Sequence, residues 1–262
     1  MTVIFVHIPK TAGTALSEAI NTRVGMHLRF EGYTHTTQTP YWHQRILFRV
    51  YQHIYRLTHN NPRIVHQSQT LWHTLYAQPQ DDYIFGHFYV QTHLQPAPNN
   101  RWQPIPNYRY ITFVRDPLHR AISKYYYTLT PSQSGLSATE THRFAQQFPT
   151  LGDFLKSPQY ANIQYNYLQE LPIDTYTVIG VVEDIEKSLV VLGHAVKELA
   201  NLSLAMVNKT TSKNTAEIDA LQPDVILEFR QRNALDYQLY ATALAKLDSQ
   251  YQSIMHQREE SA

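Results

Sequence analysis

One stretch near the beginning of the chain decides its fold: Val3-Ile4-Phe5-Val6-His7-Ile8-Pro9-Lys10-Thr11-Ala12-Gly13-Thr14-Ala15-Leu16. A short apolar run breaks at a turn of small residues and resumes with helical spacing, which predicts a strand, a tight loop and a helix. The loop residues Thr11, Ala12, Gly13 and Thr14 allow backbone N–H groups to converge on an anion, and the helix adds the positive end of its dipole. Lys10 is expected beside that anion.

The loop differs from the phosphate loop of nucleotide kinases. The chain has no Gly-x-x-x-x-Gly-Lys-Ser/Thr sequence, and Lys10 precedes the turn instead of following it. The segment Pro9–Thr14 after a buried strand resembles the 5′-phosphosulfate loop of sulfotransferases that use 3′-phosphoadenosine 5′-phosphosulfate (PAPS). Taken alone, the segment also fits an ordinary strand–turn–helix unit with a lysine near its turn, so both interpretations stay open at this point.

Length and composition favour a single α/β domain over residues 1–256, followed by a polar tail over 257–262. The absence of cysteine excludes disulfides and thiolate metal sites, and the 14 histidines form no His-Glu-x-x-His pattern, so we expect no metal. There is no apolar run of about 18 residues, and the first strand begins at Val3. We therefore expect no membrane span and a cytoplasmic protein.

The charge distribution is uneven although the formal net charge is +1. Between Gly32 and Arg115 the only acids are Asp81 and Asp82, and there is no lysine. The same interval contains seven arginines: Arg45, Arg49, Arg56, Arg63, Arg101, Arg109 and Arg115. Guanidinium groups bind phosphate, sulfate and carboxylate in a bidentate manner, so this bias suits anion recognition. A solvated basic surface is the alternative, and the sequence leaves it open.

Periodicity predicts further elements along the chain. We expect a helix over 15–24, a loop over 26–40, an amphipathic basic helix over 41–59, a short helix over 68–77, a loop over the proline-rich 95–106, a helix over 185–199, and long helical structure over 223–255 broken near Asn233.

Two further strands place polar residues at their ends. Tyr83–Phe85 is a predicted buried strand that stops at Gly86 and His87, and the strand over 108–114 runs into Arg115. Asp116 and Pro117 then suit the N-cap and first position of a helix. Ligands of open α/β sheets bind beyond the carboxyl ends of the strands. His87 is therefore well placed for chemistry, and Arg115 and Ser123, which lies about two turns into the helix, are expected to meet an anion in the same crevice.

The segment Val114–Tyr127 resembles the 3′-phosphate motif of PAPS-dependent sulfotransferases. The combination of Pro-Lys-Thr, Gly-His, Val-Arg-Asp-Pro and Ser-x-Tyr-Tyr is most similar to the uronyl 2-O-sulfotransferase branch, which modifies heparan and dermatan chains. Gln164–Leu168 and Thr177–Asp184 resemble later segments of that branch. The segment Asn208–Lys213 resembles its lysine-threonine loop, and a solvated polar turn is the alternative there. The chain differs from the branch in its lack of cysteines and its shorter middle region, and we expect no anchor and stem.

The resemblance implies a P-loop-like three-layer α/β fold with a central, mostly parallel sheet flanked by helices. It implies transfer of a sulfuryl group from PAPS to a hydroxyl of a carbohydrate or glycan-like acceptor, without a metal. In that reaction His87 takes the acceptor proton and Lys10 stabilises charge on the leaving phosphate oxygen. The remaining roles go to the amides of residues 11–14 for the 5′-phosphate, to Arg115 and Ser123 for the 3′-phosphate, and to the nucleotide-closing residues Lys209, Thr210 and Thr211.

Other assignments remain open on the sequence alone. His7 competes with His87 as the base, but its place in the first strand predicts that it faces the core. A phosphoryl-transfer enzyme would need a magnesium-binding carboxylate near the phosphates, and none is obvious. A non-catalytic module that binds acidic glycans through the arginines would not need His87. The expected partner is a hydroxylated acceptor, an anionic glycan if the arginines contact it, and not a nucleic acid.

Overall fold

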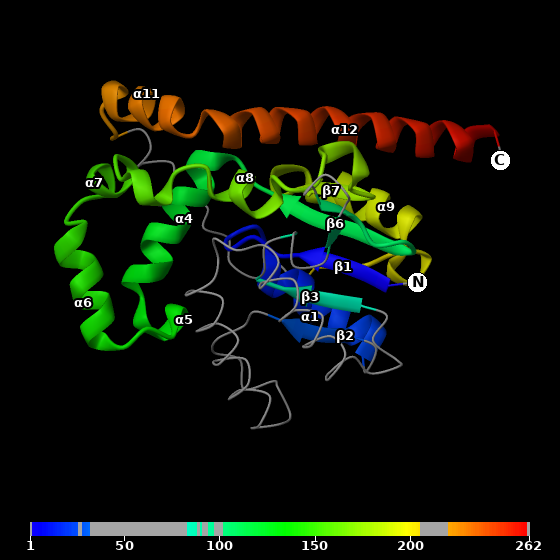
Figure 1. The fold of residues 1–262 in the computed structure, drawn as a ribbon, viewed down its shortest axis with the longest axis horizontal. Coiled ribbons are helices and arrows are strands. Elements are labelled where there is room, and N and C mark those ends of the chain that lie inside the picture. The colour runs from blue at the N-terminus through cyan, green and yellow to red at the C-terminus, as the bar shows by residue number, and fades with distance from the viewer. Residues whose placement is uncertain are drawn as a thin grey trace.

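The computed structural model describes residues 2–25, 28–31, 83–87, 90, 94–96, 102–204 and 220–260. Its centre is a five-stranded sheet in the order β2-β3-β1-β6-β7, in which every neighbouring pair is parallel. The strands are β1 (Thr2–Val6), β2 (Leu28–Glu31), β3 (Tyr83–Gly86), β6 (Tyr108–Val114) and β7 (Val178–Val181). Helices flank this sheet (Figure 1), so the α/β prediction is confirmed.

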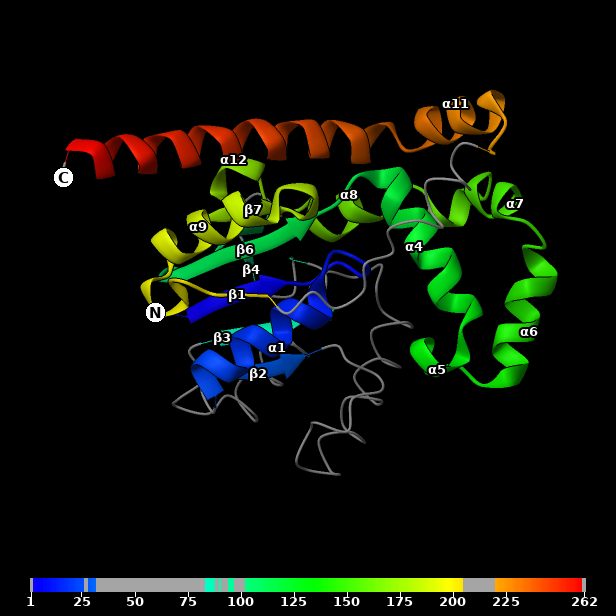
Figure 2. The ribbon, with the colours of Figure 1, turned by 180° about the vertical axis from the view of Figure 1, so that it is seen from behind.

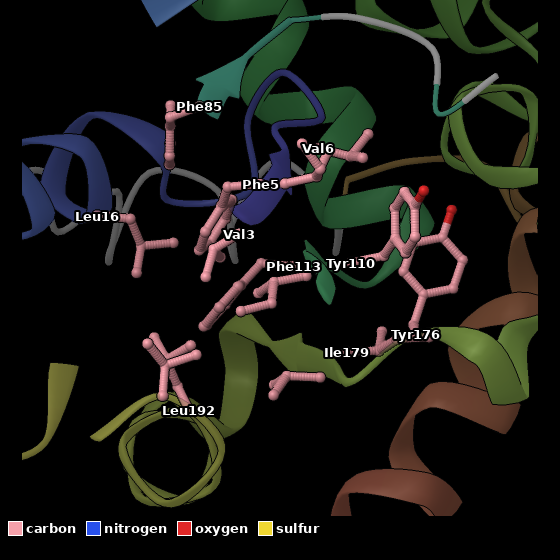
Figure 3. Packing of buried hydrophobic residues seen from close by; sticks show 14 of the residues in the cluster. Val3, Phe5, Val6, Leu16, Phe85, Tyr110, Phe113, Tyr176, Ile179 and Leu192 are labelled. Atoms are coloured by element: carbon pink, nitrogen blue, oxygen red, sulfur yellow. The ribbon is translucent and has the colours of Figure 1, made fainter. Parts of the chain in front are cut away.

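The core of the sheet is built on β1, which lies between β3 and β6. In the register Phe5 pairs with Phe85 on β3 and with Ile111 on β6. The ring of Phe5 lies 4.7 Å from that of Phe85 and 5.7 Å from that of Phe113 (Figure 3). Strands buried on both faces read as continuous apolar runs, as Val3–Val6 does. Because all five strands are parallel, their carboxyl ends meet at one edge.

Helices α1 (Gly13–Val24) and α9 (Ile185–Ala195) pack on the sheet. Their residues Leu16 and Leu192 belong to the same buried cluster as Phe5 and Phe113 (Figure 3). The end of α1 is tied to the segment after α9, because Arg23 donates hydrogen bonds to the carbonyls of Glu198 and Ala200. The long helix α12 (Ala234–Glu260) runs along β7 and α9 (Figures 1 and 2).

A second buried cluster holds together the helices that follow β6. Aromatic rings dominate it, with Tyr125, Phe144, Phe148 and Phe154 within 6 Å of one another in successive pairs. Figure 1 shows these helices beyond the end of the sheet toward which the strand arrows point. They are α4 (Pro117–Leu129), α5 (Pro131–Ser134), α6 (Ala138–Gln147), α7 (Leu151–Leu155) and α11 (Pro223–Arg232). Shorter elements complete the described chain: η3 (Pro158–Tyr160), α8 (Ile163–Leu168), η4 (Ile173–Thr175), η5 (Val182–Asp184) and η6 (Lys197–Leu199).

Several predicted elements are confirmed. The helix over 15–24 lies within α1, the strand over 108–114 is β6, and the predicted break near Asn233 separates α11 from α12. Asp116 caps α4 by accepting a hydrogen bond from the His119 N–H. The helix predicted over 185–199 is α9 followed by η6.

Two predictions need correction. The loop expected over 26–40 contains β2, a four-residue strand that pairs with β3. The loop expected over 95–106 contains a separate antiparallel pair, β4 (Leu94–Pro96) and β5 (Trp102–Pro104), which tolerates its prolines because it stands outside the central sheet. Helix α12 continues to Glu260, and the polar side chains of residues 257–260 are exposed.

The helices predicted over 41–59 and 68–77 lie outside the described residues. The division into a domain over 1–256 and a tail stays a prediction. No described helix is both long and apolar enough to cross a membrane.

Candidate active site

The loop between β1 and α1 has a backbone suited to an anion. Lys10 and Ala12 adopt left-handed conformations, with φ of 75° and 62°. The Thr11 hydroxyl donates to the Ile8 carbonyl at 2.8 Å and fixes the turn. Ala12 is the N-cap of α1, and its methyl side chain cannot accept a bond from the first N–H groups of the helix. Those amides therefore form an anion-binding end next to Lys10.

The imidazole of His7 lies against the first residue of α1. A Cβ atom added to Gly13 would stand 1.5 Å from the His7 Nε2 atom. Gly13 has no positive φ, so glycine is required here by the close approach of the ring and not by backbone conformation. His7 therefore fixes how closely α1 approaches the end of β1.

The two histidines at the ends of β1 and β3 are joined through the backbone. The His7 N–H donates to the Gly86 carbonyl at 2.8 Å, and the His87 Nδ1 atom lies 2.9 Å from the His7 carbonyl oxygen. A carbonyl oxygen only accepts, so Nδ1 of His87 carries the proton and the lone pair of the neutral ring is on Nε2. The rings stack with centroids 4.2 Å apart. The prediction that His7 is buried is confirmed, but its contact with His87 was not foreseen.

Both histidines are neutral near pH 7. Burial lowers the pKa of His87 to about 4, the bond to the His7 carbonyl opposes this, and the ammonium groups of Lys124 and Lys10 lower the pKa further. Burial also lowers the pKa of His7 well below its usual value, and His87 and Lys10 add to the effect. The sequence predicted a pKa near 6.5 for His87 because it does not show how deeply the ring is buried.

Positive charge gathers at this end of the sheet. Burial, Lys124 and Arg115 together lower the pKa of Lys10 to about 8. The Lys10 ammonium lies 3.7 Å from the centroid of the Tyr127 ring. The buried Nε atom of Arg115 has no hydrogen-bond partner among the described residues, and its ion pair with Glu183 is long at 3.7 Å. Cations that raise one another's energy in this way favour binding of an anion.

Arg115 is held by a side chain from another helix. The amide of Gln164 on α8 accepts from the Arg115 N–H at 2.9 Å and donates to the Arg115 carbonyl at 2.8 Å. The start of α8 is in turn bound to α12, because the buried carboxylate of Asp236 accepts from the N–H groups of Gln164 and Tyr165. These bonds fix the backbone of Arg115 directly beyond β6.

The structure brings together most of the predicted site. Lys10, His87 and Arg115 are close enough to form a connected set of electrostatic interactions, in which Lys124 also takes part. Ser123 is buried on α4, one residue before Lys124. The predicted nucleotide-closing residues Lys209, Thr210 and Thr211 lie outside the described residues.

Sequence reasoning missed the contributions of α4 beyond Ser123. Arg120, Lys124 and Tyr127 follow one another at steps of four and three residues, which places them on one side of the helix. Arg120 is buried, and its Nε atom has no hydrogen-bond partner in the described chain. The polar spacing of these three residues was a signal that could have been used. Among the described residues, no group of three or more His, Asp or Glu side chains could hold a metal ion.

Comparison with known proteins gives one family. A family model described as "Sulfotransferase family" matches residues 2–241. No curated protein matches the chain. Among solved structures, the chain is similar to mouse sulfotransferase SULT7A1 complexed with PAP, with 13% identity, a TM-score of 0.41, and coverage of 96% of this chain and 88% of that one. Because the family model matches most of the 262 residues of the chain, the chain belongs to the sulfotransferase family and is an enzyme that transfers sulfuryl groups.

Proposed function

We propose that this enzyme transfers the sulfuryl group of PAPS to a hydroxyl of a carbohydrate-like acceptor. The observation that carries the proposal is the meeting, at one sheet edge, of an anion-binding loop with Lys10 and of a neutral histidine whose lone pair is on Nε2. The loop suits a phosphate and the histidine suits a hydroxyl. A sulfuryl transferase needs both within reach of one sulfur atom.

In the proposed reaction, the acceptor hydroxyl attacks sulfur in line with the bond to the 5′-phosphate. Its proton goes to Nε2 of His87, a new bond forms between the acceptor oxygen and sulfur, and the old sulfur–oxygen bond breaks. The electron pair of the broken bond stays on the phosphate oxygen, where Lys10 stabilises the charge. The products are the sulfate ester and 3′-phosphoadenosine 5′-phosphate (PAP), and His87 returns its proton to water.

Different elements bind the 5′-phosphate and the 3′-phosphate of the donor. The amides of residues 11–14 bind the 5′-phosphate, because they stand at the start of α1 without a side-chain cap. Arg115 and Ser123 bind the 3′-phosphate, and the predicted loop containing Lys209, Thr210 and Thr211 closes over the nucleotide. The Nε–H donor of Arg115 supports this role, because it is buried and has no hydrogen-bond partner in the described part of the chain.

The substitution His87→Ala tests the proposed base. We expect kcat to fall by about 10²–10⁴-fold, because only proton transfer in the transition state is lost. Binding of PAP should be nearly unchanged. PAP at a hundred times its dissociation constant should still protect the variant against unfolding by about 2.7 kcal/mol, as it does the wild type.

The controls separate this proposal from its rivals. Protection of the wild type by ATP with Mg²⁺, but not by PAP, would indicate a phosphoryl-transfer enzyme. Binding of acidic glycans that is independent of PAP and unaffected by His87→Ala would indicate a non-catalytic glycan-binding module. A folded, PAPS-bound His87→Ala enzyme with normal kcat would exclude His87 as the base.

A further inference from the structure

The side of α4 facing the loop carries a lysine that the proposed reaction leaves without a role. The Lys124 ammonium lies 5.8 Å from the centroid of the Tyr127 ring, and the Lys10 ammonium lies 3.7 Å from the same centroid. Two cations from different elements, the loop after β1 and helix α4, therefore gather around one phenol ring. An aromatic face attracts an ammonium group, but it does not neutralise its charge.

This pair of lysines is not neutralised by the described part of the chain. Within it, no carboxylate lies within ion-pair distance of Lys10 or Lys124, although other lysines such as Lys187 pair with acids at less than 3 Å. Lys124 is half-buried. A partly buried cation without a counterion is costly, and an anionic ligand would relieve that cost.

The neighbours of Lys124 locate it within the site. After burial, its ammonium is the largest influence lowering the pKa of Lys10, and it lowers the pKa of His87 more than Lys10 does. Its own pKa is lowered by burial and then by Arg120. Lys124 therefore shares the Tyr127 ring with the lysine of the leaving oxygen, and its charge also acts on the proposed base. In sulfuryl transfer, the group between those two positions is the sulfuryl group itself.

We propose that Lys124 is a further catalytic residue, which binds the oxygens of the transferring sulfuryl group between His87 and Lys10. The inference rests on the proposed function. Lys124 breaks and forms no covalent bond in the step: it donates N–H hydrogen bonds to the sulfuryl oxygens while the acceptor oxygen bonds to sulfur and the 5′-phosphate oxygen leaves. Tyr127 supplies the ring beside which both ammonium groups lie.

The position of Lys124 on α4 separates it from the 3′-phosphate. Ser123 is its neighbour in sequence, but successive residues of a helix point about 100° apart. The Lys124 ammonium lies at the Tyr127 ring together with that of Lys10, the residue assigned to the leaving oxygen. This shared ring places Lys124 at the sulfur end of the donor.

The test compares a ligand that has the sulfuryl group with one that lacks it. PAPS and PAP are titrated separately, without acceptor, into the wild type and into Lys124→Met, Lys124→Arg and the control Lys156→Met, whose lysine is exposed at the end of α7. We expect Lys124→Met to bind PAPS about tenfold more weakly and PAP normally, and to lose about 10²-fold in kcat. Lys124→Arg should recover most of the PAPS affinity, and Lys156→Met should match the wild type.

Normal PAP binding by Lys124→Met also shows that the variant is folded. Equal weakening of PAP and PAPS would overturn the inference, because Lys124 would then bind a nucleotide phosphate. Unchanged affinity and kcat would overturn it too, since Lys124 would then be a solvated cation. If the wild type binds neither ligand, the proposed function itself fails, which is a different result from either of these.

Discussion

The imidazole of His87 owes its chemistry to one atom, the carbonyl oxygen of His7. That oxygen fixes the proton on Nδ1, while burial between the strand ends keeps the ring neutral. Lys10, in the same site, loses its proton more readily than an exposed lysine, because burial and the neighbouring cations lower its pKa to about 8. At the scale of residues, the site combines a neutral histidine base with a lysine whose pKa is lowered.

These two pKa values predict the pH dependence of kcat/KM for the donor. Activity should rise as the pH increases through about 4, where His87 loses its proton and becomes a base. It should fall as the pH increases through about 8, where Lys10 loses the charge that stabilises the leaving oxygen. Rates at low PAPS concentration across this range report the pKa values of the free enzyme.

Variants identify each limb of that profile. Lys10→Arg should remove the alkaline limb, since guanidinium stays charged. An acid limb that persists in the residual activity of His87→Ala would belong to the donor or another group. The fold must be checked at each pH, because below about 6.5 the unfolded chain takes up protons that the buried histidines resist, so the free energy of unfolding decreases toward pH 4.

A second prediction at this scale concerns the binding of the 3′-phosphate by Arg115. Arg115→Ala should weaken PAP binding by about 1.5–3 kcal/mol, because a charge-assisted hydrogen bond to the 3′-phosphate is lost. Ser123→Ala should have a smaller effect. Calorimetric titration with PAP and with adenosine 5′-phosphosulfate, which has no 3′-phosphate, distinguishes the contacts. An equal loss for both nucleotides would contradict the assignment.

The sequence identified the residues of the site that belong to strand ends. Lys10, His87 and Arg115 follow apolar runs, so local pattern was sufficient to place them. It did not identify Lys124 or the stacking of His7 on His87, because these contacts depend on how α4 and β3 approach β1. The lowered pKa of His87 was missed for the same reason, since burial is a property of the packed chain.

At the scale of elements, the join between β1 and α1 is tightly packed. The His7 ring occupies the space where a side chain of Gly13 would be, and the helix begins there with an unbonded anion-binding end. Strand, ring and helix are therefore fitted to one another, and a change in any of them displaces the loop amides.

Gly13→Ala tests this fit. The added methyl would overlap the His7 ring, so either the ring or α1 must move, and we expect a loss of about 1–3 kcal/mol in the free energy of unfolding together with weaker PAP binding. Urea unfolding and PAP titration measure the two effects. The matched control is Gly152→Ala in α7, where the nearest atom lies at an ordinary 3.6 Å, and which should be neutral or stabilising. Equal stability of both variants would contradict the packing described here.

Elements differed in how well the sequence predicted them. Local sequence patterns correctly predicted three features: the β1–α1 unit, β6 with the Asp116 cap, and the break at Asn233. The strand β2 was missed because four residues carry little periodicity and its partner β3 is far away in sequence. The pair β4 and β5 was missed because its prolines argue against a central strand, not against an isolated ribbon.

At the scale of the whole molecule, the question is whether the arginine-rich interval contacts an anion. Two of its seven arginines are described, and they differ. Arg109 donates to the Ala195 carbonyl at the end of α9, which is a structural role, whereas Arg115 stands at the active site. Arg45, Arg49, Arg56, Arg63 and Arg101 lie outside the described residues.

The charge of this interval still predicts an acceptor preference. We expect an anionic acceptor whose apparent affinity decreases with added salt, because exposed charges are screened over about 10 Å at 0.1 M salt. Turnover at saturating PAPS, measured across ionic strength with an anionic sugar and a neutral one, separates this effect from the charge of the donor. If salt affects both acceptors equally and both are used equally well, the arginines form only a solvated surface.

The strand order has a consequence for how the enzyme is made. β1 leaves the ribosome before the other four strands, yet it is the central strand, and its neighbours β3 and β6 are encoded far downstream. At ~5–20 residues per second, the roughly eighty residues between β1 and β3 take about 4–16 s to translate. During that time an apolar strand with two unpaired edges is exposed in the nascent chain. The hydrogen bonds that the Gln164 and Tyr165 N–H groups donate to Asp236 can form only when synthesis is nearly complete. We therefore expect the nascent enzyme to acquire nucleotide affinity late and to need protection from aggregation until then.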